Sequence, residues 1–148
     1  MIALLQRVIR ASVTVGDEEV GAIGTGVLVF LGVMKGDGEA QARRLAERVA
    51  NYRILSDERG RPGRSVLDVP EASFLVVSQF TLGADTRKGR RPDYGPTAGA
   101  EQAEALYEVF VQALRSHGAP VETGRFGAMM QVALVNDGPV TFRLEVES

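Results

Sequence analysis

The first part of the chain shows patterns of apolar and polar positions that are typical of β-strands. Residues 5–15 largely alternate, and a turn at residues 16–18 leads to a short strand expected over residues 19–23. Residues 27–33 and 73–80 instead form nearly continuous apolar runs. Such runs suit strands that are covered on both faces. We therefore expect two buried strands in the interior of the protein.

Two segments carry helical spacing. Apolar residues recur at helical intervals over residues 42–52 and again over residues 103–114. Thr97 is a candidate N-cap for the second helix, and the Gly-Ala-Pro sequence at residues 118–120 ends it. Each helix follows a strand, which predicts crossovers that lay both helices on one side of a sheet.

The C-terminal part again alternates, over residues 130–135 and 140–146. Between them, Asn136, Asp137 and Gly138 favour a hairpin turn. Pro139 is unusual at the start of a strand because it has no N–H for a ladder. About 5–6% of X–Pro bonds are cis, so the pattern alone favours a trans peptide. The chain is predicted to be one mixed α/β domain over residues 1–148, with two β-sheets and two helices packed on one side in β/β/α layers.

Composition narrows the chemistry. The 148 residues include 17 basic and 19 acidic side chains, which gives a formal net charge of −2. This charge excludes a protein that coats nucleic acid, but it is compatible with a local basic patch. The absence of cysteine excludes disulfides and thiolates, and the single histidine, His117, excludes a poly-histidine metal site. No run approaches the ~20 apolar residues of a membrane span. We expect a cytoplasmic protein with no metal and no membrane partner.

The end of the second buried strand is the first candidate site. Ser78, Gln79, Phe80 and Thr81 lie where that strand runs into a long loop. Ligands of α/β folds bind beyond the carboxyl ends of strands, and a turning backbone can present N–H groups to an oxyanion. The alternative is a strand end whose hydroxyls bond nearby backbone groups. A hydroxyl nucleophile needs a base. Because no histidine is close in sequence, that base would be the substrate itself or water.

The loop that follows is the second candidate. It holds four cations in five positions, Arg87, Lys88, Arg90 and Arg91. Arginine pairs well with phosphate oxygens. The acidic residues Asp85 and Asp93 reduce the net charge of residues 85–94 to +2. A solvated loop is the ordinary interpretation of such a run, and its place directly after the strand end favours phosphate contact. No nucleotide-binding glycine pattern is present, so no cofactor is implied.

Residues 78–82 followed by residues 87–92, together with residues 136–141, closely resemble the D-aminoacyl-tRNA deacylase (D-tyrosyl-tRNA(Tyr) deacylase) family. Residues 5–8, 11–13, 124–128 and 130–132 agree with it. The resemblance covers essentially the whole chain. It implies hydrolysis of the ester that links a D-amino acid to the 3′ end of tRNA, and removal of glycine from mischarged tRNA. It also implies a homodimer in which a cis Gly138-Pro139 dipeptide enters the partner's pocket and excludes L side chains.

The resemblance further assigns roles to residues. Thr81, Gln79, Ser78 and Phe80 would form the catalytic turn, and the four cations of the loop would contact tRNA phosphates. The expected substrate contacts are Gly138, Pro139, Asn136, Met130 and Arg7. Thr81 matches a threonine proposed as nucleophile in the family. The other mechanism uses the 2′-hydroxyl of the terminal adenosine, and the lack of an evident base for Thr81 favours it.

The chain departs from the family at its rim. Residues 61–65 read Arg-Pro-Gly-Arg-Ser where a Met-Asn pair is common, Met129 replaces an acidic residue, and Asp93-Tyr94 replaces Ser-Phe. Two other functions stay open from the residues alone. One is a non-catalytic RNA-binding module that uses the cationic loop, and the other is a general esterase with Ser78 or Thr81 as nucleophile.

Overall fold

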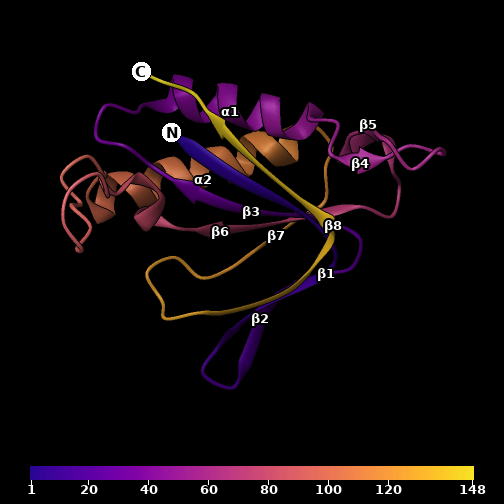
Figure 1. The fold of residues 1–148 in the computed structure, drawn as a ribbon, viewed down its shortest axis with the longest axis horizontal. Helices are drawn as coiled ribbons and strands as arrows, with labels where there is room; N and C mark the ends of the chain where they lie inside the picture. Colours follow the sequence, from indigo (N-terminus) through magenta and orange to yellow (C-terminus); the bar gives the residue numbers. More distant parts are fainter.

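The computed structural model describes residues 1–148 and contains eight strands, two helices and two short 3-10 turns. The elements are, in chain order, β1 (Ile2–Val15), β2 (Glu18–Ile23), β3 (Gly26–Gly32), α1 (Glu39–Asn51), β4 (Leu55–Ser56), β5 (Pro62–Arg64), η1 (Val66–Asp68), β6 (Ser73–Ser78), η2 (Phe80–Gly83), α2 (Ala100–Ser116), β7 (Val121–Thr123) and β8 (Gln131–Glu145). Six strands form one mixed sheet, and β4 and β5 form a separate small sheet (Figure 1). The predicted mixed α/β class with two helices is confirmed.

The long strand β1 organises the sheet. One of its edges pairs antiparallel with β8 along almost its whole length. Its other edge pairs first with β3 and then with β2, so these two short strands act as one long neighbour. Beyond β3, the strands β6 and β7 continue the sheet in parallel. The order strand, helix, strand in β3–α1–β6 and β6–α2–β7 produces these parallel pairs, as the crossover rule predicts.

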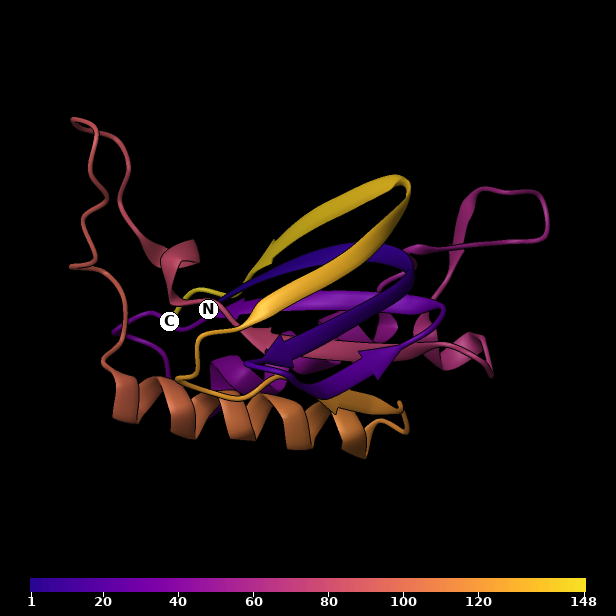
Figure 2. The same ribbon diagram turned by 90° about the horizontal axis from the view of Figure 1, so that it is seen from below.

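The sheet curls, and the curl creates the layers. Both helices cover one face of β3 and β6, where Val29, Phe74 and Val76 are buried (Figure 2). The opposite face of the same strands buries Leu28 and Val77 in a second, smaller core beneath the curled half of the sheet. The expected two covered strands are therefore confirmed. The two β layers come mainly from one bent sheet, because β2 and β8 both pair with β1.

Both helices begin directly after a glycine. Gly38 is the N-cap of α1, and its N–H donates to the side chain of Gln41 at 2.7 Å. The N-cap of α2 is Gly99, not Thr97, so that prediction is wrong. Thr97 is buried and donates its hydroxyl to the carbonyl of Tyr94 at 2.8 Å, which fixes the loop ahead of the helix instead. Neither helix is long and apolar enough to cross a bilayer.

The hairpin expected at residues 136–139 is absent. β8 runs through this segment as one strand with irregular register opposite β1, where Val8 faces Asn136. The physical reason is that both halves of β8 pair with β1, so they cannot pair with each other. The Asn136 side chain closes the irregularity locally: Oδ1 accepts the N–H of Val140 at 3.2 Å and Nδ2 donates to Thr141 Oγ1 at 3.1 Å. The Gly138-Pro139 peptide bond is cis, although the low frequency of cis X–Pro bonds favoured trans.

Candidate active site

The end of β6 turns sharply into η2. Residues 78–81, the strand-end turn, begin with half-buried Ser78, and the N–H of Gln79 makes a hydrogen bond of 2.8 Å to the carbonyl of Leu31 on β3. The Gln79 side-chain amide donates to the hydroxyl of Thr81. This bond orients Thr81 but removes no proton from it, because an amide is not a base. The turn therefore presents hydroxyl, amide and backbone groups and lacks a general base for Thr81.

A cavity of about 650 Å³ opens beside this turn. Its walls come from the strand-end turn, the start of α2, and the segment that leads into β8. The lining residues are Val77, Ser78, Gln79, Phe80, Thr97, Ala98, Ala100, Ala103, Phe126, Gly127, Ala128, Met129, Met130 and Val132. Mostly apolar walls with a few polar groups at one end are typical of a small-molecule pocket. Thr81 is exposed and does not line the cavity, whereas Met130 lines it.

One wall of the cavity is fixed from behind by Tyr107 on α2. Its buried hydroxyl donates to the carbonyl of Val76 on β6 at 2.8 Å. Its ring packs against that of Phe126, with the centroids 5.9 Å apart. Burial raises the pKa of Tyr107 well above its usual range, so its hydroxyl stays protonated and acts as a donor. This contact ties the helix layer to the strand that ends in the site.

The cationic loop forms a projecting hairpin, here called the basic arm (residues 85–93). Asp85 and Asp93 pair through two backbone hydrogen bonds of 2.8 and 2.9 Å, and Gly89 near the tip has a φ of +68°. The guanidinium of Arg87 holds Asp85 in two bonds of 2.9 and 2.7 Å. These bonds lower the pKa of Asp85 from 3.8 to about 2. Lys88, Arg90 and Arg91 make no ion pair, so three of the four predicted cations are free to bind an anion.

Two exposed aromatic rings stand between the cavity and the basic arm. Phe80 and Tyr94 have ring centroids 5.2 Å apart and planes tilted by 53°. Phe80 is 54% exposed and Tyr94 is 44% exposed, which is high for large apolar side chains. Aromatic faces of this kind stack well on nucleobases. Tyr94, one of the departures from the family pattern, therefore still supplies a ring at this place.

Gly138 and Pro139, here called the tip, form an exposed bend of β8. Arg7 fixes it from below: Nε donates to the carbonyl of Asp137 at 3.0 Å, and Nη1 donates to Ser56 Oγ on β4 at 2.8 Å. The Arg7 side chain is only 12% exposed. Arg7 thus contacts the tip and the small sheet, and does not line the cavity of its own chain.

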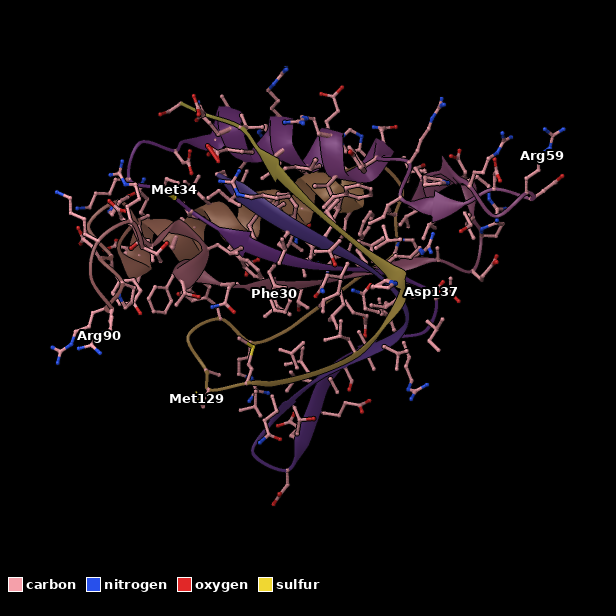
Figure 3. All side chains as sticks on the ribbon, in the orientation of Figure 1. Phe30, Met34, Arg59, Arg90, Met129 and Asp137 are labelled. Carbon is pink, nitrogen blue, oxygen red and sulfur yellow. The ribbon has the colours of Figure 1, made fainter.

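Within one chain, the tip and the cavity lie on opposite sides of the molecule. Figure 3 shows Arg90 and Met129 on one side of the molecule and Asp137 on the other. Figure 2 also separates the bend of β8 from the basic arm. A single chain therefore brings together the strand-end turn, Met130 and the basic arm. It leaves Arg7, Asn136, Gly138 and Pro139 in a second group.

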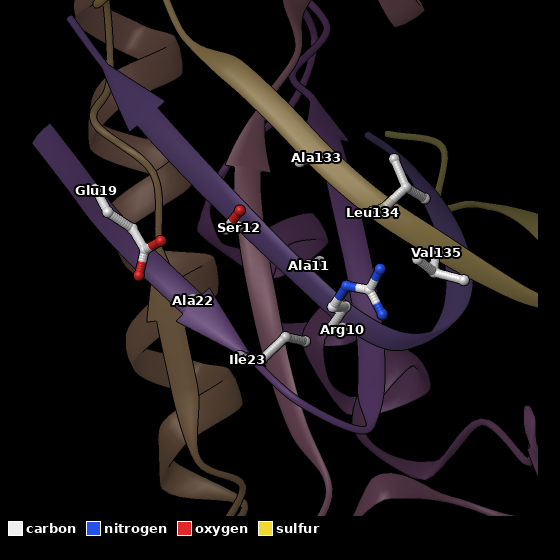
Figure 4. Close-up of a pocket in the computed structure, with 9 residues that line it drawn as sticks. All are labelled: Arg10, Ala11, Ser12, Glu19, Ala22, Ile23, Ala133, Leu134 and Val135. Carbon is white, nitrogen blue, oxygen red and sulfur yellow. The ribbon is translucent and has the colours of Figure 1, made fainter. Parts of the chain in front are cut away.

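The structure adds features that the sequence did not reveal. The cavity walls at Phe126, Ala128 and the start of α2 went unrecognised, because no local pattern marks residues from distant segments that face one space. A smaller cavity of about 320 Å³ lies over β1, β2 and β8 (Figure 4). Small and aliphatic side chains line most of it, so it lacks the convergent polar groups of the strand-end turn. No three His, Cys, Asp or Glu side chains come together in a way that could hold a metal.

Comparisons with known proteins agree over the whole chain. The family model for D-Tyr-tRNA(Tyr) deacylase matches residues 4–145. The D-aminoacyl-tRNA deacylase of Idiomarina loihiensis is 58% identical over 146 residues, covering 99% of this chain and 100% of the relative. That of a Roseiflexus species is 61% identical over 145 residues, covering 98% and 93%.

Two solved structures have the same fold. A c-Myc DNA unwinding element binding protein superposes with a TM-score of 0.93 at 42% identity and covers 100% of both chains. A probable eukaryotic D-amino acid tRNA deacylase superposes with a TM-score of 0.85 at 20% identity over 98% of both chains.

The mixed α/β fold and the cavity at its strand end, taken with these relatives, define a single-domain enzyme of the ester hydrolase class. The chain belongs to the D-Tyr-tRNA(Tyr) deacylase family.

Proposed function

We propose that this protein hydrolyses the ester of D-aminoacyl-tRNA to free tRNA and amino acid, as a chiral proofreading step in translation, and that it also removes glycine from mischarged tRNA. The observation that carries the proposal is the strand-end turn, which opens into an apolar cavity beside a basic arm. Family membership supports it. Because aminoacyl-tRNA is a substrate of translation, we place the protein in the cytoplasm.

In this mechanism each part of the site has one task. The cavity takes the aminoacyl group, and the backbone N–H groups of Phe80 and Thr81, at the start of η2, donate to the oxyanion that forms at the ester carbonyl. Phe80 and Tyr94 hold the terminal adenine, and Lys88, Arg90 and Arg91 contact phosphates. Water attacks the carbonyl, assisted by the ribose 2′-hydroxyl, and the 3′-oxygen leaves with a proton. Thr81 positions the substrate, since its only polar side-chain partner is an amide.

We further propose a homodimer in which each tip enters its partner's cavity. The tip is exposed, held rigidly by Arg7, and distant from the cavity of its own chain. Backbone placed close to the α-carbon of the aminoacyl group leaves no room for an L side chain, which is a repulsive basis for selectivity. Asn136 would hold the tip in shape from its own chain, and Met130 would face the partner's tip across the cavity.

Hydrolysis of D-tyrosyl-tRNA against L-tyrosyl-tRNA, with purified protein and no added metal, tests the activity. We expect rapid loss of the D ester alone. Loss of both esters would indicate a general esterase and would contradict the chiral function of the tip. Loss of neither ester, with tRNA still bound, would indicate an RNA-binding module.

A second substrate distinguishes the mechanisms. We expect D-tyrosyl-tRNA that ends in 2′-deoxyadenosine to react roughly 10²–10⁴-fold more slowly, the range that a positioned acid–base group contributes. The Thr81→Ala variant should lose much less, because in this mechanism Thr81 only positions the substrate. A covalent acyl-enzyme on Thr81 or Ser78, with full activity on the deoxy substrate, would show nucleophilic catalysis instead.

A further inference from the structure

A second basic hairpin projects from the end of the molecule that carries the tip. This β4–β5 arm (residues 53–64) contains four arginines, at positions 53, 59, 61 and 64, and two acidic residues, Asp57 and Glu58. Its net charge is therefore +2, equal to that of the region around the basic arm. Figure 3 shows Arg59 at its outer end, pointing away from the protein. The proposed function leaves this arm without a role.

Of the two acidic residues in the arm, Asp57 forms hydrogen bonds with the arm's own backbone. Asp57 Oδ1 accepts the backbone N–H groups of Arg59 and Arg61 at 2.8 and 3.0 Å. The N–H of Asp57 donates to the carbonyl of Arg61 at 2.6 Å, and Gly60 takes the turn with a φ of +77°. Since the carboxylate faces the loop backbone, the Arg59 guanidinium makes no ion pair. The arm thus presents cationic groups from a preorganised turn.

Arg7 joins this arm to the tip. Its guanidinium donates to Ser56 Oγ at 2.8 Å on one side and to the carbonyl of Asp137 at 3.0 Å on the other. Arg64 Nε also donates to the carbonyl of Ser56, at 2.7 Å. A nearly buried side chain therefore bridges the two segments. Wherever the tip docks, the β4–β5 arm is carried with it.

Within one chain this arm lies far from the cavity. Figure 3 places Arg59 on the side of Asp137, opposite Arg90 and Met129, and Figure 2 agrees in showing the two arms at opposite ends. We propose that the β4–β5 arm is a second phosphate-binding surface, and that it contacts the tRNA whose aminoacyl end lies in the partner's cavity. The inference rests on the proposed function, because the tip brings the arm to the partner. The acceptor stem would then be held between the basic arm of one protomer and the β4–β5 arm of the other.

Duplex RNA suits such a surface. An RNA helix is recognised mainly through its shape and its phosphate and ribose groups, for which arginine forks are well matched. Each phosphate neutralised also releases counterions, so the contact has a salt signature that a merely structural arm would not have.

The first test is the double variant Arg59→Gln/Arg61→Gln. Its matched control is Arg43→Gln/Arg44→Gln on α1, which removes the same charge. Arg61 and Arg43 each make one exposed i,i+4 ion pair, to Asp57 at 3.6 Å and to Glu39 at 3.3 Å, so both variants lose a comparable weak contact. Backbone bonds of Asp57 remain in the arm variant, so the turn keeps its shape.

The readout is the affinity for uncharged tRNA at several salt concentrations. Two lost phosphate contacts should weaken binding roughly ten- to thirtyfold near physiological salt and reduce the slope of log K against log salt by about 1.4–1.8. The control should match the wild type. The ratio of kcat/KM for D-tyrosyl-tRNA to that for the phosphate-free D-tyrosyl ester of adenosine should fall by a similar factor in the arm variant.

A heterodimer of two differently tagged chains tests whether the contact crosses the dimer. If one protomer carries Gly138→Ala, its tip no longer completes its partner's cavity. Only its own cavity, served by its partner's unchanged tip, then stays active. The two arm substitutions are added to one protomer or to the other. We expect KM for D-tyrosyl-tRNA to rise when they are in the partner with the intact tip, and to stay unchanged when they are in the Gly138→Ala protomer.

The opposite pattern would place the contact within one chain and overturn the proposal. Equal affinity and equal salt slope in all variants would also overturn it, and D-selective hydrolysis by the wild type would then leave the proposed function standing. Absence of D-selective hydrolysis in the wild type would overturn both, and is recognised before any variant is made.

Discussion

At Gly138 the backbone and its neighbours leave no space for a side chain. Its φ of +124° lies in the region that favours glycine. A Cβ built there would lie 2.8 Å from Arg7 Nη2 and 2.8 Å from Val140 Cγ2. The same guanidinium holds the carbonyl of Asp137, so a shift of Arg7 would release the bend beside the tip. The absence of a Cβ at Gly138 therefore allows Arg7 to hold the bend of β8 in place.

We expect Gly138→Ala to lower kcat/KM for D-tyrosyl-tRNA tenfold or more while the protein stays folded, because the backbone strain costs only about 1–3 kcal/mol. Gly118→Ala is the matched control. Gly118 has a φ of +95° with no atom within 4 Å of the added Cβ, so it shares the strain without the clash. Unchanged rate and unchanged D selectivity in the Gly138 variant would contradict the role of the tip.

The Asp85–Arg87 pair predicts a pH dependence of the basic arm. The pKa of Asp85 is lowered from 3.8 to about 2 by its bonds to Arg87, so the folded arm favours the charged carboxylate. This contribution to the order of the arm is complete above about pH 4 and is lost as pH falls through about 2. A carboxyl titration by NMR should show the low midpoint in the wild type and a higher midpoint in Arg87→Gln, still below 3.8 because the backbone N–H of residue 87 keeps its bond to Asp85 Oδ1. Equal midpoints in the two proteins would mean that the ion pair is absent in solution.

At the scale of elements, α2 does more than cover the sheet. Its side chain Tyr107 bonds the carbonyl of Val76 on β6, two residues before the strand-end turn. The same carbonyl accepts the N–H of Gly124 at 3.1 Å, which directs the chain after β7 toward the cavity wall. Helix, strand and wall segment therefore meet at a single backbone oxygen.

We expect Tyr107→Phe to lower the free energy of unfolding by about 1 kcal/mol, near the net value of one hydrogen bond, because Gly124 still satisfies the carbonyl of Val76. Tyr52→Phe is a suitable control, since the Tyr52 hydroxyl makes no hydrogen bond to the protein. Urea unfolding measures both variants. An equal effect of the two substitutions would show that the Tyr107 hydrogen bond does not contribute to stability.

At the scale of the whole molecule, the curl of the sheet depends on close approach between its two halves. A Cβ at Gly21 on β2 would lie 2.3 Å from the carbonyl oxygen of Thr123 on β7 and 3.2 Å from Leu75 on β6. Because Gly21 has no side chain, β2 can lie directly on the parallel strands β6 and β7. The fold of the sheet over itself also positions Val132 of β8, and Met130 just before it, as a wall of the cavity.

We expect Gly21→Ala to lower the free energy of unfolding by about 1–3 kcal/mol, the usual cost of forcing extra atoms into a packed site. Gly24→Ala, where nothing lies within 4 Å of the added Cβ, should change it by less than about 0.5 kcal/mol. Thermal or urea unfolding of the pair gives the comparison. Similar stabilities for both variants would mean that β2 does not pack as closely on β7 in solution.

Local sequence patterns were sufficient to predict the features that depend on neighbours along the chain. Period-two spacing located β1, β2 and the two halves of β8, and helical spacing located both helices. Two apolar runs identified β3 and β6 as covered on both faces, whereas the short strands β4, β5 and β7 were not predicted. The polar residues at the end of β6 and the cations after them marked the candidate site, because strand ends and charge runs are local patterns. The resemblance to the family came from the same local motifs.

The pairing of segments that are distant in sequence became evident only in the folded chain. The Asn136–Gly138 signal favours a hairpin, yet β1 offers one continuous edge to both halves of β8, and pairing along that edge satisfies more backbone groups than a local hairpin would. Contacts between distant segments also determine the cavity wall at Phe126, the bridge that Arg7 makes, and the separation of the tip from its own cavity. These features depend on hydrogen bonds and packing between residues remote in sequence, and no local pattern of hydrophobic and polar positions encodes which of those residues meet.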